Sequence, residues 1–303
     1  MKNNKIAVLL AIVCTVLWGT AFPFIKLGYS ALKIAENDIG SKLLFAGYRF
    51  TFAGLAVFAV VCIMGKKFPI LAKKDIMPVS LLGLVQTFAQ YILSYIGIGF
   101  TSSTNTSIIT ACSSFFTVIA ASLFFKSDKL GFMKIFGCVL GFSGVICING
   151  MGGFSADTLL GDLLILASTL SASTGNIYSK KLAQGRNPFV ITAYQLSLGG
   201  VLLIISGMLL GGKTVFSNIQ GVAILLWLAF VSAVAFSIWT TLLKYHEASK
   251  ISVFNLLVPV IGTILSGVML KEDVFRAETF VSLILISLGI IAVNLSGKRR
   301  KIK

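Results

Sequence analysis

From Ile76 to Phe125 the chain carries no charged side chain and no histidine. A bilayer is crossed by about 20 apolar residues of helix, so this run is long enough for two crossings. Its middle reads Gly97-Ile98-Gly99-Phe100-Thr101-Ser102-Ser103, which predicts a tight turn between them. The whole chain agrees, because 56% of its 303 residues are hydrophobic and only 12% are charged. We therefore expect an integral membrane protein.

The remaining uncharged runs, added to these two, predict an all-α membrane protein of ten transmembrane helices. The expected spans are residues 6–30, 43–64, 77–97, 102–125, 131–149, 160–181, 188–210, 219–243, 251–270 and 276–296. No linker between them is long enough to hold a soluble domain. The function must therefore be carried out within the membrane.

The first apolar run also invites interpretation as a cleaved signal peptide, because a basic segment, Met1 to Lys5, precedes it. The run is longer than a typical signal-peptide core, and no small-residue cleavage site of the A-x-A kind follows it. We expect a retained first helix.

The net charge of +16 follows the expected topology. With the N-terminus in the cytoplasm, the outside segments hold only Lys33, Lys42, Lys213, Lys271 and Arg276, and nearly all other basic residues fall inside. The positive-inside rule then predicts a multi-pass protein of the cell membrane with both termini cytoplasmic. The basic tail, Lys298 to Lys303, adds attraction to anionic lipid headgroups. The charge gives no reason to expect a nucleic-acid partner.

The chain repeats itself. Residues 126–149, which begin Lys-Ser-Asp and end in Asn149, have a counterpart 145 residues later at 271–294, which begins Lys-Glu-Asp and ends in Asn294. This predicts two five-helix repeats, residues 1–150 and 151–303. Because five is odd, the second repeat must cross in the opposite sense, as in transporters that work by alternating access.

Small and polar residues line one face of the ninth predicted helix and, carried back 145 residues, one face of the fourth. The two stripes are Ser252, Asn255, Pro259, Gly262 and Ser266, and Ser107, Thr110, Ser114, Thr117 and Ala121. In a membrane such a face serves close helix packing or lines a polar cavity. Both interpretations place the stripes near the axis between the halves.

Other helices offer polar and aromatic candidates for a cavity wall. The first and sixth helices align with an offset of 154, which pairs Phe22 with Asn176 and Lys26 with Lys180. On the third helix Gln86 and Gln90 share a face, and an amide in hydrocarbon is costly unless it is paired. The predicted substrate-binding residues are Trp18, Phe22, Lys26, Gln86, Gln90, Tyr91, Ser107, Asn176, Trp239 and Asn255.

Pro23 and Pro259 are the prolines that lie well inside spans, one in each half. Each removes a backbone donor and frees the carbonyl four residues earlier, so we expect hinges there. Gly137, Gly141 and Gly144 on the fifth helix, echoed by Ser282 and Gly289 on the tenth, suit close helix contacts. Those contacts lie either within the monomer or in a homodimer.

Several of these features together resemble a known family. The sequence Trp18 to Lys26, the Tyr48-Arg49-Phe50 triplet, Gly161-Asp162, and the pattern from Tyr245 through Pro259 to Asp273 are similar to the EamA branch of the drug/metabolite transporter superfamily. The resemblance covers about residues 6 to 296. It implies ten helices in two inverted repeats, and a central cavity walled mainly by helices one, three, four, six, eight and nine. It also implies transport, often export, of small metabolites such as amino acids.

Two departures from the family pattern bear on mechanism. Ser114 stands where the first repeat of the family often has proline, and Trp18 stands where short multidrug exporters of the superfamily carry a membrane glutamate. The acidic residues of this chain all fall near helix ends or in loops, so a proton relay through carboxylates is not indicated.

The function we expect is therefore a secondary transporter, in the exporting direction, of small metabolites such as amino acids. Two alternatives stay open: transport of drugs or of phosphorylated or nucleotide-linked metabolites, which would need more converging cations, and a membrane-embedded enzyme. The enzyme is disfavoured by the single histidine and by the lack of a nucleophile arrangement. No cofactor or metal is expected. Lys26 either snorkels to the outer interface or holds a substrate carboxylate, and Arg49 is expected to pair with Glu36, Asp38 or backbone carbonyls.

Overall fold

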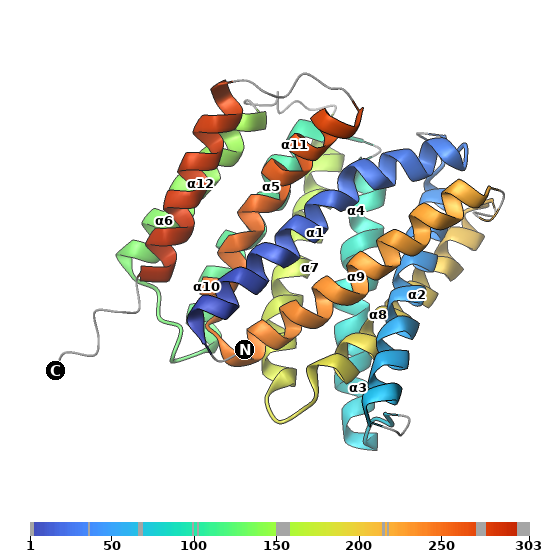
Figure 1. Ribbon diagram of the computed structural model, residues 1–303, viewed down its shortest axis with the longest axis horizontal. Coiled ribbons are helices and arrows are strands. Elements are labelled where there is room, and N and C mark those ends of the chain that lie inside the picture. The colour runs from blue at the N-terminus through green and yellow to red at the C-terminus, as the bar shows by residue number, and fades with distance from the viewer. Residues whose placement is uncertain are drawn as a thin grey trace.

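Ten helical rods stand side by side in the computed structural model (Figure 1), which describes residues 3–35, 37–65, 69–98, 100–101, 103–149, 158–213, 216, 218–270 and 277–295. The unbroken helices are α1 (Asn4–Ala31), α2 (Ile39–Gly65), α5 (Ser103–Phe124), α6 (Phe132–Asn149), α7 (Leu159–Ala183), α8 (Pro188–Leu209), α9 (Ile219–Tyr245) and α12 (Ala277–Leu295). Two further rods are interrupted: α3 (Lys73–Leu82), η1 (Gly83–Ala89) and α4 (Gln90–Ile98), and α10 (Ala248–Ser252), η2 (Val253–Leu256) and α11 (Leu257–Leu270). The predicted ten-helix fold is confirmed.

The two halves run in opposite senses. In Figure 1, α1 rises from the end of the bundle at which the N-terminus lies, whereas α7, its counterpart in the second half, descends toward that end. Inverted repeats are therefore present, as predicted. The expected boundary between them, at residues 150 and 151, lies outside the described residues, and so does the segment 271–276 that carried part of the repeat pattern.

Helix contacts follow a two-fold pattern. The α2 helix packs along α8, and α6 packs along α12, so each of these pairs joins equivalent helices of the two halves. The α1 helix packs on α9 and α11, and α7 packs in the same way on η1–α4 and α5. A pseudo-two-fold axis therefore runs between the pairs, in the membrane plane, as inverted repeats require.

The α2–α8 pair shows this symmetry atom by atom. A Cβ placed on Gly54 would lie 2.6 Å from the backbone nitrogen of Ser197, and one placed on Gly200 would lie 2.5 Å from that of Thr51. The four residues are related by one offset, because Thr51 aligns with Ser197 and Gly54 with Gly200, 146 positions apart. Small residues let the two backbones touch, which is how membrane helices without a hydrophobic driving force associate.

The α6–α12 pair has the same kind of close backbone contact, made by the predicted glycines. A Cβ on Gly137 would lie 2.5 Å from the carbonyl oxygen of Gly289, and one on Gly144 would lie 2.9 Å from that of Ser282. These small-residue faces meet each other within the monomer. The homodimer stays a prediction.

The two interrupted rods differ in how they break. The Gly83–Ala89 segment is π-helical, and Val253–Leu256 is a short 3-10 helix just before Pro259. Proline cannot donate to the carbonyl four residues earlier, so the break at Asn255 has a direct cause. Pro23 lies inside α1, which continues as a helix from Asn4 to Ala31.

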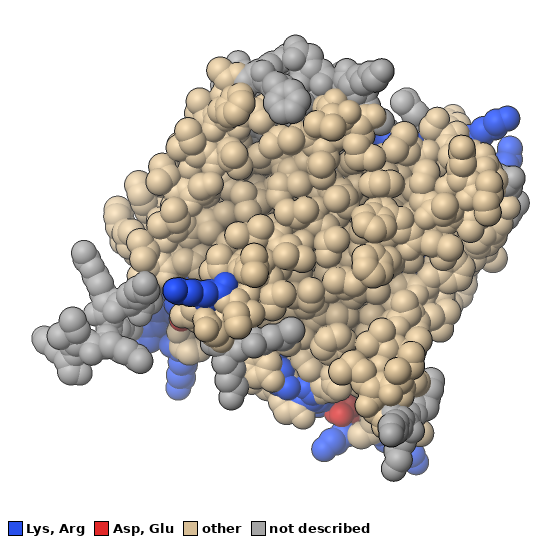
Figure 2. Space-filling view, viewed as in Figure 1, with Lys and Arg blue, Asp and Glu red and all other residues tan. Residues whose placement is uncertain are grey.

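On the face shown in Figure 2 the charged side chains gather at the two ends of the bundle, and the surface between them is uncharged. We call the end at which α1 begins and α12 ends the basic end. It carries Lys5, Lys73, Lys74, Lys126, Lys129, Lys134, Lys180, Lys181, Arg186, Lys244 and Lys250, whereas the described basic residues toward the opposite end are Lys26, Lys33, Lys42 and Lys213. Leu9, Leu55, Ile205 and Ile284 are examples of the large apolar side chains exposed between the ends. This surface is that of a multi-pass membrane protein.

Candidate functional site

An amide centre joins three helices from both halves. The Nε2 atom of Gln86 on η1 donates to Oδ1 of Asn176 on α7 over 3.1 Å, and the indole Nε1 of Trp239 on α9 donates to the same oxygen over 3.3 Å. All three side chains are at least 94% buried. The carbonyl oxygen of Gln86 is buried and has no partner among the described residues. A buried acceptor left open is costly in hydrocarbon, so it is suited to a donor from outside the protein.

The π-helical segment positions Gln86. A Cβ on Gly175 would lie 2.6 Å from Cβ of Gln86, so a glycine is needed there for the glutamine to approach α7. Ser168 and Ser171 of α7 donate to the backbone carbonyls of Gln90 and Val85, each over 2.7 Å. Hydroxyl groups thus bind carbonyls within and just after the segment where the regular helical ladder is altered.

Aromatic rings extend from the amide centre toward α2. The ring of Trp18 lies 4.9 Å from that of Trp239 and 5.5 Å from that of Phe236, both edge to face. Phe50 lies 6.2 Å from Phe236 and 4.4 Å from Tyr91. Such rings give a large apolar surface with defined geometry. We call Trp18, Phe50, Gln86, Tyr91, Asn176, Phe236 and Trp239 together the aromatic–amide cluster.

Arg49 borders this cluster on α2. Its Nε donates to Oγ of Ser232 on α9 over 2.8 Å, and its guanidinium carbon lies 5.1 Å from the centre of the Phe50 ring. The side chain is only 4% exposed. The predicted pairing with Asp38 does not occur; that carboxylate instead accepts from the backbone nitrogen of Ser41, over 2.8 Å, at the start of α2. Glu36, the other predicted partner, lies outside the described residues.

Polar cross-links tie the helices together at the basic end. The fully buried Asp128 binds Lys134 over 2.5 Å and accepts from the backbone nitrogen and hydroxyl of Ser249; Lys134 also contacts Glu247 over 3.2 Å. These bonds fasten the α5–α6 connection to the start of α10. Lys180, at the end of α7, donates to the backbone carbonyls of Leu243, over 3.0 Å, and His246.

A further cross-link at this end lies outside the spans. Arg186, between α7 and α8, binds Asp75 over 2.6 Å, and this bond raises the pKa of the guanidinium above its ordinary value. The pair connects the start of α3 to the α7–α8 turn. In this structure the helices of the basic end are therefore held together by side-chain bonds.

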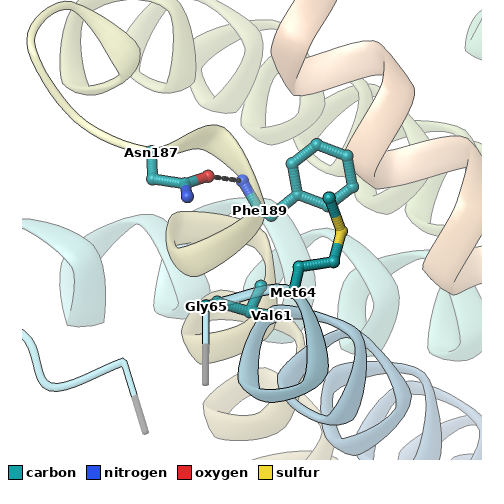
Figure 3. Close-up of a pocket in the computed structure, with 5 residues that line it drawn as sticks. All are labelled: Val61, Met64, Gly65, Asn187 and Phe189. Carbon is teal, nitrogen blue, oxygen red and sulfur yellow. Dashed lines mark hydrogen bonds between the residues drawn. The ribbon is translucent and has the colours of Figure 1, made fainter. Parts of the chain in front are cut away.

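A pocket of about 270 Å³ lies apart from the cluster, between the end of α2 and the start of α8 (Figure 3). It is lined by Val61, Met64, Gly65, Asn187 and Phe189. The Asn187 side chain is engaged in capping α8, because its Oδ1 accepts from the backbone nitrogen of Phe189 over 2.9 Å. The remaining lining is apolar. A substrate site is expected to place several polar groups around its ligand, and the pocket lacks such a set.

Comparison with known proteins decides the family. The sequence pattern described as the EamA-like transporter family matches residues 5–150 and again residues 159–295. The chain belongs to the EamA-like transporter family. It is a membrane transporter, and the relatives of this EamA-like transporter are named as transporters or efflux pumps rather than as enzymes.

Three relatives cover nearly the whole chain. An uncharacterized transporter of Bacillus subtilis, YvbV, is 30% identical and spans 99% of this chain and 95% of its own. Proteins named as probable amino-acid metabolite efflux pumps are 26% identical in Escherichia coli and 28% identical in Salmonella typhimurium, and each match spans 96% of this chain and 95% of the pump. A solved crystal structure superposes with a TM-score of 0.82 at 17% identity, over 95% of this chain and 98% of the other, which supports the fold.

Five of the predicted substrate-binding residues come together in this EamA-like transporter: Trp18, Gln86, Tyr91, Asn176 and Trp239. Gln90 follows them on α4, half-buried, and its backbone carbonyl accepts from Ser168. Asn255 lies in η2, and its buried Oδ1 has no partner within the described part of the chain. Lys26 is exposed, two turns beyond Trp18 along α1 toward the opposite end. The side chains of Phe22 and Ser107 lie outside what the structure describes.

The sequence interpretation missed Phe50, Phe236 and Ser232. For Ser232 and Phe236 the signal was the spacing on α9, where Ser232, Phe236 and Trp239 recur at steps of four and three and so share a face, whereas Phe50 had no such signal. The two polar stripes are in contact at one point, where the hydroxyl of Ser114 on α5 donates to the backbone carbonyl of Ser252 on α10 over 2.9 Å.

Proposed function

We propose that this chain is a secondary transporter that exports small, partly apolar metabolites of the amino-acid class. The observation that carries the proposal is the aromatic–amide cluster: a buried amide centre with an open acceptor on Gln86, beside a set of aromatic rings, between the two halves. An apolar side chain of the substrate would lie against Trp18 and Phe236, and its ammonium group would donate to Gln86. Two relatives named as probable amino-acid metabolite efflux pumps support the substrate class.

Alternating access follows from the inverted halves. The α2–α8 and α6–α12 pairs lie at the symmetry axis and pack through backbone contacts. These two helix pairs therefore stay in place during the transport cycle while the other helices move. The α1, α9 and α11 helices on one side, and α7, α4 and α5 on the other, then rock about the cluster. The polar cross-links of the basic end hold that side together in the state seen here.

We further propose that transport needs no carboxylate relay and that the basic end faces the cytoplasm. The described acidic side chains, among them Asp38, Asp75, Asp128, Asp162 and Glu247, lie at helix ends or in connections rather than at mid-membrane. Proton and sodium sites built on carboxylates are expected within the spans. The excess of Lys and Arg at the basic end supports its cytoplasmic placement.

Counterflow into liposomes tests the substrate class. The purified protein is reconstituted, the liposomes are loaded with one unlabelled compound, and uptake of the labelled compound is followed with and without a pH gradient. The panel contains aliphatic and aromatic L-amino acids, a sugar phosphate and a cationic drug. We expect exchange of apolar amino acids at a rate that the gradient leaves unchanged. Exchange of the sugar phosphate or the drug alone would transfer the proposal to those substrates.

Direction is tested in cells. Expression should lower the intracellular concentration of an amino acid released from a supplied dipeptide, compared with cells expressing Asn176→Ala. A higher intracellular concentration would identify an importer.

A further inference from the structure

The guanidinium of Arg49 is the least satisfied buried cation in the described part of the chain. Only its Nε has a hydrogen-bond acceptor, the hydroxyl of Ser232, and no carboxylate of the described residues lies within 4.0 Å of it. A guanidinium has five N–H donors, one on Nε and four on the two Nη atoms. Among the described residues only the Nε donor has an acceptor, so the four Nη donors have none there. The Phe50 ring compensates part of the charge but accepts no conventional hydrogen bond.

Other buried cations of the same molecule are treated differently. Lys134 is held by two carboxylates, and Lys180 by two backbone carbonyls as well as the Phe125 ring. Those two lysines lie toward the basic end, whereas Arg49 is the eleventh residue of α2, well inside the span. A charge in that position is costly, and such residues usually face a partner or the path of a substrate.

The second half shows that the helix pair does not need the charge. The offset of 146 that relates Thr51 to Ser197 places Gln195 of α8 at the position equivalent to Arg49. The Tyr48-Arg49-Phe50 triplet thus corresponds to Tyr194-Gln195-Leu196. Gln195 is fully buried, its backbone lies against Gly83 of η1, and its amide atoms have no hydrogen-bond partner among the described residues. The α8 helix therefore carries a buried neutral side chain at the position where α2 carries a cation, so the fold has no general need for a charge there.

We propose that Arg49 binds the carboxylate of the transported molecule. The Ser232 hydroxyl fixes Nε, and the two Nη groups, each with two donors, are left for a carboxylate, which accepts in a matching fork. Arg49 packs on Phe50, which contacts Phe236 and Tyr91, so a carboxylate bound here keeps the rest of the substrate beside the rings. Gln86 stands at the other end of the same cluster, where its Oε1 accepts a hydrogen bond from the substrate's ammonium group. This inference rests on the proposed function and adds a specificity determinant to it.

A carboxylate suits the site better than a phosphate. A phosphate dianion calls for more than one cation. Within the described residues Arg49 is the one cation that we find beside the cluster, and Lys26 is exposed near the far end of α1. A monoanion balances one guanidinium. The site should therefore distinguish an acid from its neutral amide.

Ligand-induced thermal stabilisation of the purified protein tests the assignment without requiring transport. The probes are L-phenylalanine, L-phenylalaninamide, 3-phenylpropionate, phenyl phosphate and phenethylamine, applied to the wild type, Arg49→Gln, Arg49→Lys and Lys26→Gln. Arg49→Gln copies the residue of the second half and should fold. We expect the wild type to bind both carboxylates at least tenfold more tightly than the amide or the amine. Arg49→Gln should lose that preference, Arg49→Lys should keep part of it, and Lys26→Gln should keep all of it.

The outcomes separate the two proposals. If 3-phenylpropionate binds in an Arg49-dependent way and L-phenylalanine does not, the carboxylate site stands and the amino-acid class fails. If L-phenylalanine binds equally well to the wild type and to Arg49→Gln, the amino-acid class stands and the role of Arg49 is overturned. Binding of phenyl phosphate alone, of no carboxylate at all, or loss of selectivity in Lys26→Gln alone also overturns it. Should Arg49→Gln not fold, Ser232→Ala replaces it, with an expected threefold to tenfold weaker binding of carboxylates and unchanged binding of the amide.

Discussion

Gln86 and Asn176, from opposite halves of the chain, form a 3.1 Å hydrogen bond between a π-helical segment and α7. The same Asn176 oxygen accepts from the Trp239 indole, so one amide holds two donors that would otherwise lie unpaired in the membrane. The bond therefore couples the halves at the place where we put the substrate.

Replacement of Asn176 by alanine should weaken both stability and transport. The change leaves the Gln86 and Trp239 donors unpaired, at a cost of about 1–3 kcal/mol for a buried polar group. We expect a lower melting temperature in detergent and a loss of counterflow larger than the loss of protein in the membrane. Thr174→Ala, an exposed position on the same helix, is the matched control and should leave both unchanged. Equal behaviour of the two variants would show that the amide centre has no special role.

Substitution of Gly289 by alanine should destabilise the α6–α12 pair. The added methyl group would overlap the backbone carbonyl of Gly137, which cannot move without shifting the helix. Overpacking of this kind costs about 1–3 kcal/mol. Gly131→Ala is the control, because a Cβ there meets nothing within 4 Å. The melting temperatures of the two variants, measured in the same detergent, should differ; a fall for Gly131→Ala as large as that for Gly289→Ala would argue against tight packing.

Removal of the buried carboxylate at the basic end should have a large effect. Asp128 is fully buried, and Asp128→Ala leaves the Lys134 ammonium with Glu247 alone. Breaking a buried pair by removing one partner costs about 3–5 kcal/mol. Glu247→Ala should cost less, about 1 kcal/mol or under, because this side chain is partly exposed. Thermal unfolding of both variants provides the comparison, and a larger fall for Glu247→Ala would reverse the assigned order.

The membrane orientation is testable with single cysteines. In a background lacking Cys14, Cys62, Cys112, Cys138 and Cys147, Lys213→Cys should react with a membrane-impermeant maleimide in intact cells. Lys73→Cys, at the basic end, should react only after the cells are permeabilised. Both positions are exposed, so reactivity reports sidedness. The opposite labelling pattern would place the basic end outside and refute cytoplasmic termini.

Sequence reasoning found the fold because the helices cross the membrane as long, mostly uncharged apolar runs, and the repeat predicted the number and sense of the halves. It also selected Gln86, Asn176 and Trp239, since polar and indole groups stand out in an apolar chain. It missed Phe50 and Phe236, because phenylalanine is common here and only packing decides which rings meet. The π-helical segment was missed as well: it carries no sequence signature, and seven ordinary residues, Gly83 to Ala89, form it.

The predictions for the two prolines and for the partner of Arg49 had different outcomes. The 3-10 break before Pro259 agrees with the expected interruption of that rod, whereas α1 stays helical through Pro23; whether either proline acts as a hinge stays a prediction. Arg49 was expected to pair with an acid or with carbonyls, yet Ser232 is its partner. Which helix lies opposite a given residue depends on the packing of α2 against α9, and the sequence of α2 alone does not specify it.

The reciprocal contacts between α2 and α8 have the geometry of an isologous interface, in which residue i of one copy meets residue j of the other and j meets i. Thr51 with Gly200, and Ser197 with Gly54, satisfy that rule although they belong to one chain. A five-helix polypeptide bearing this surface, inserted in both orientations, would already possess what it needs to assemble as an antiparallel pair. Fusing two such copies preserves the interface and frees each copy to diverge, which is how one half can keep an arginine where the other has a glutamine.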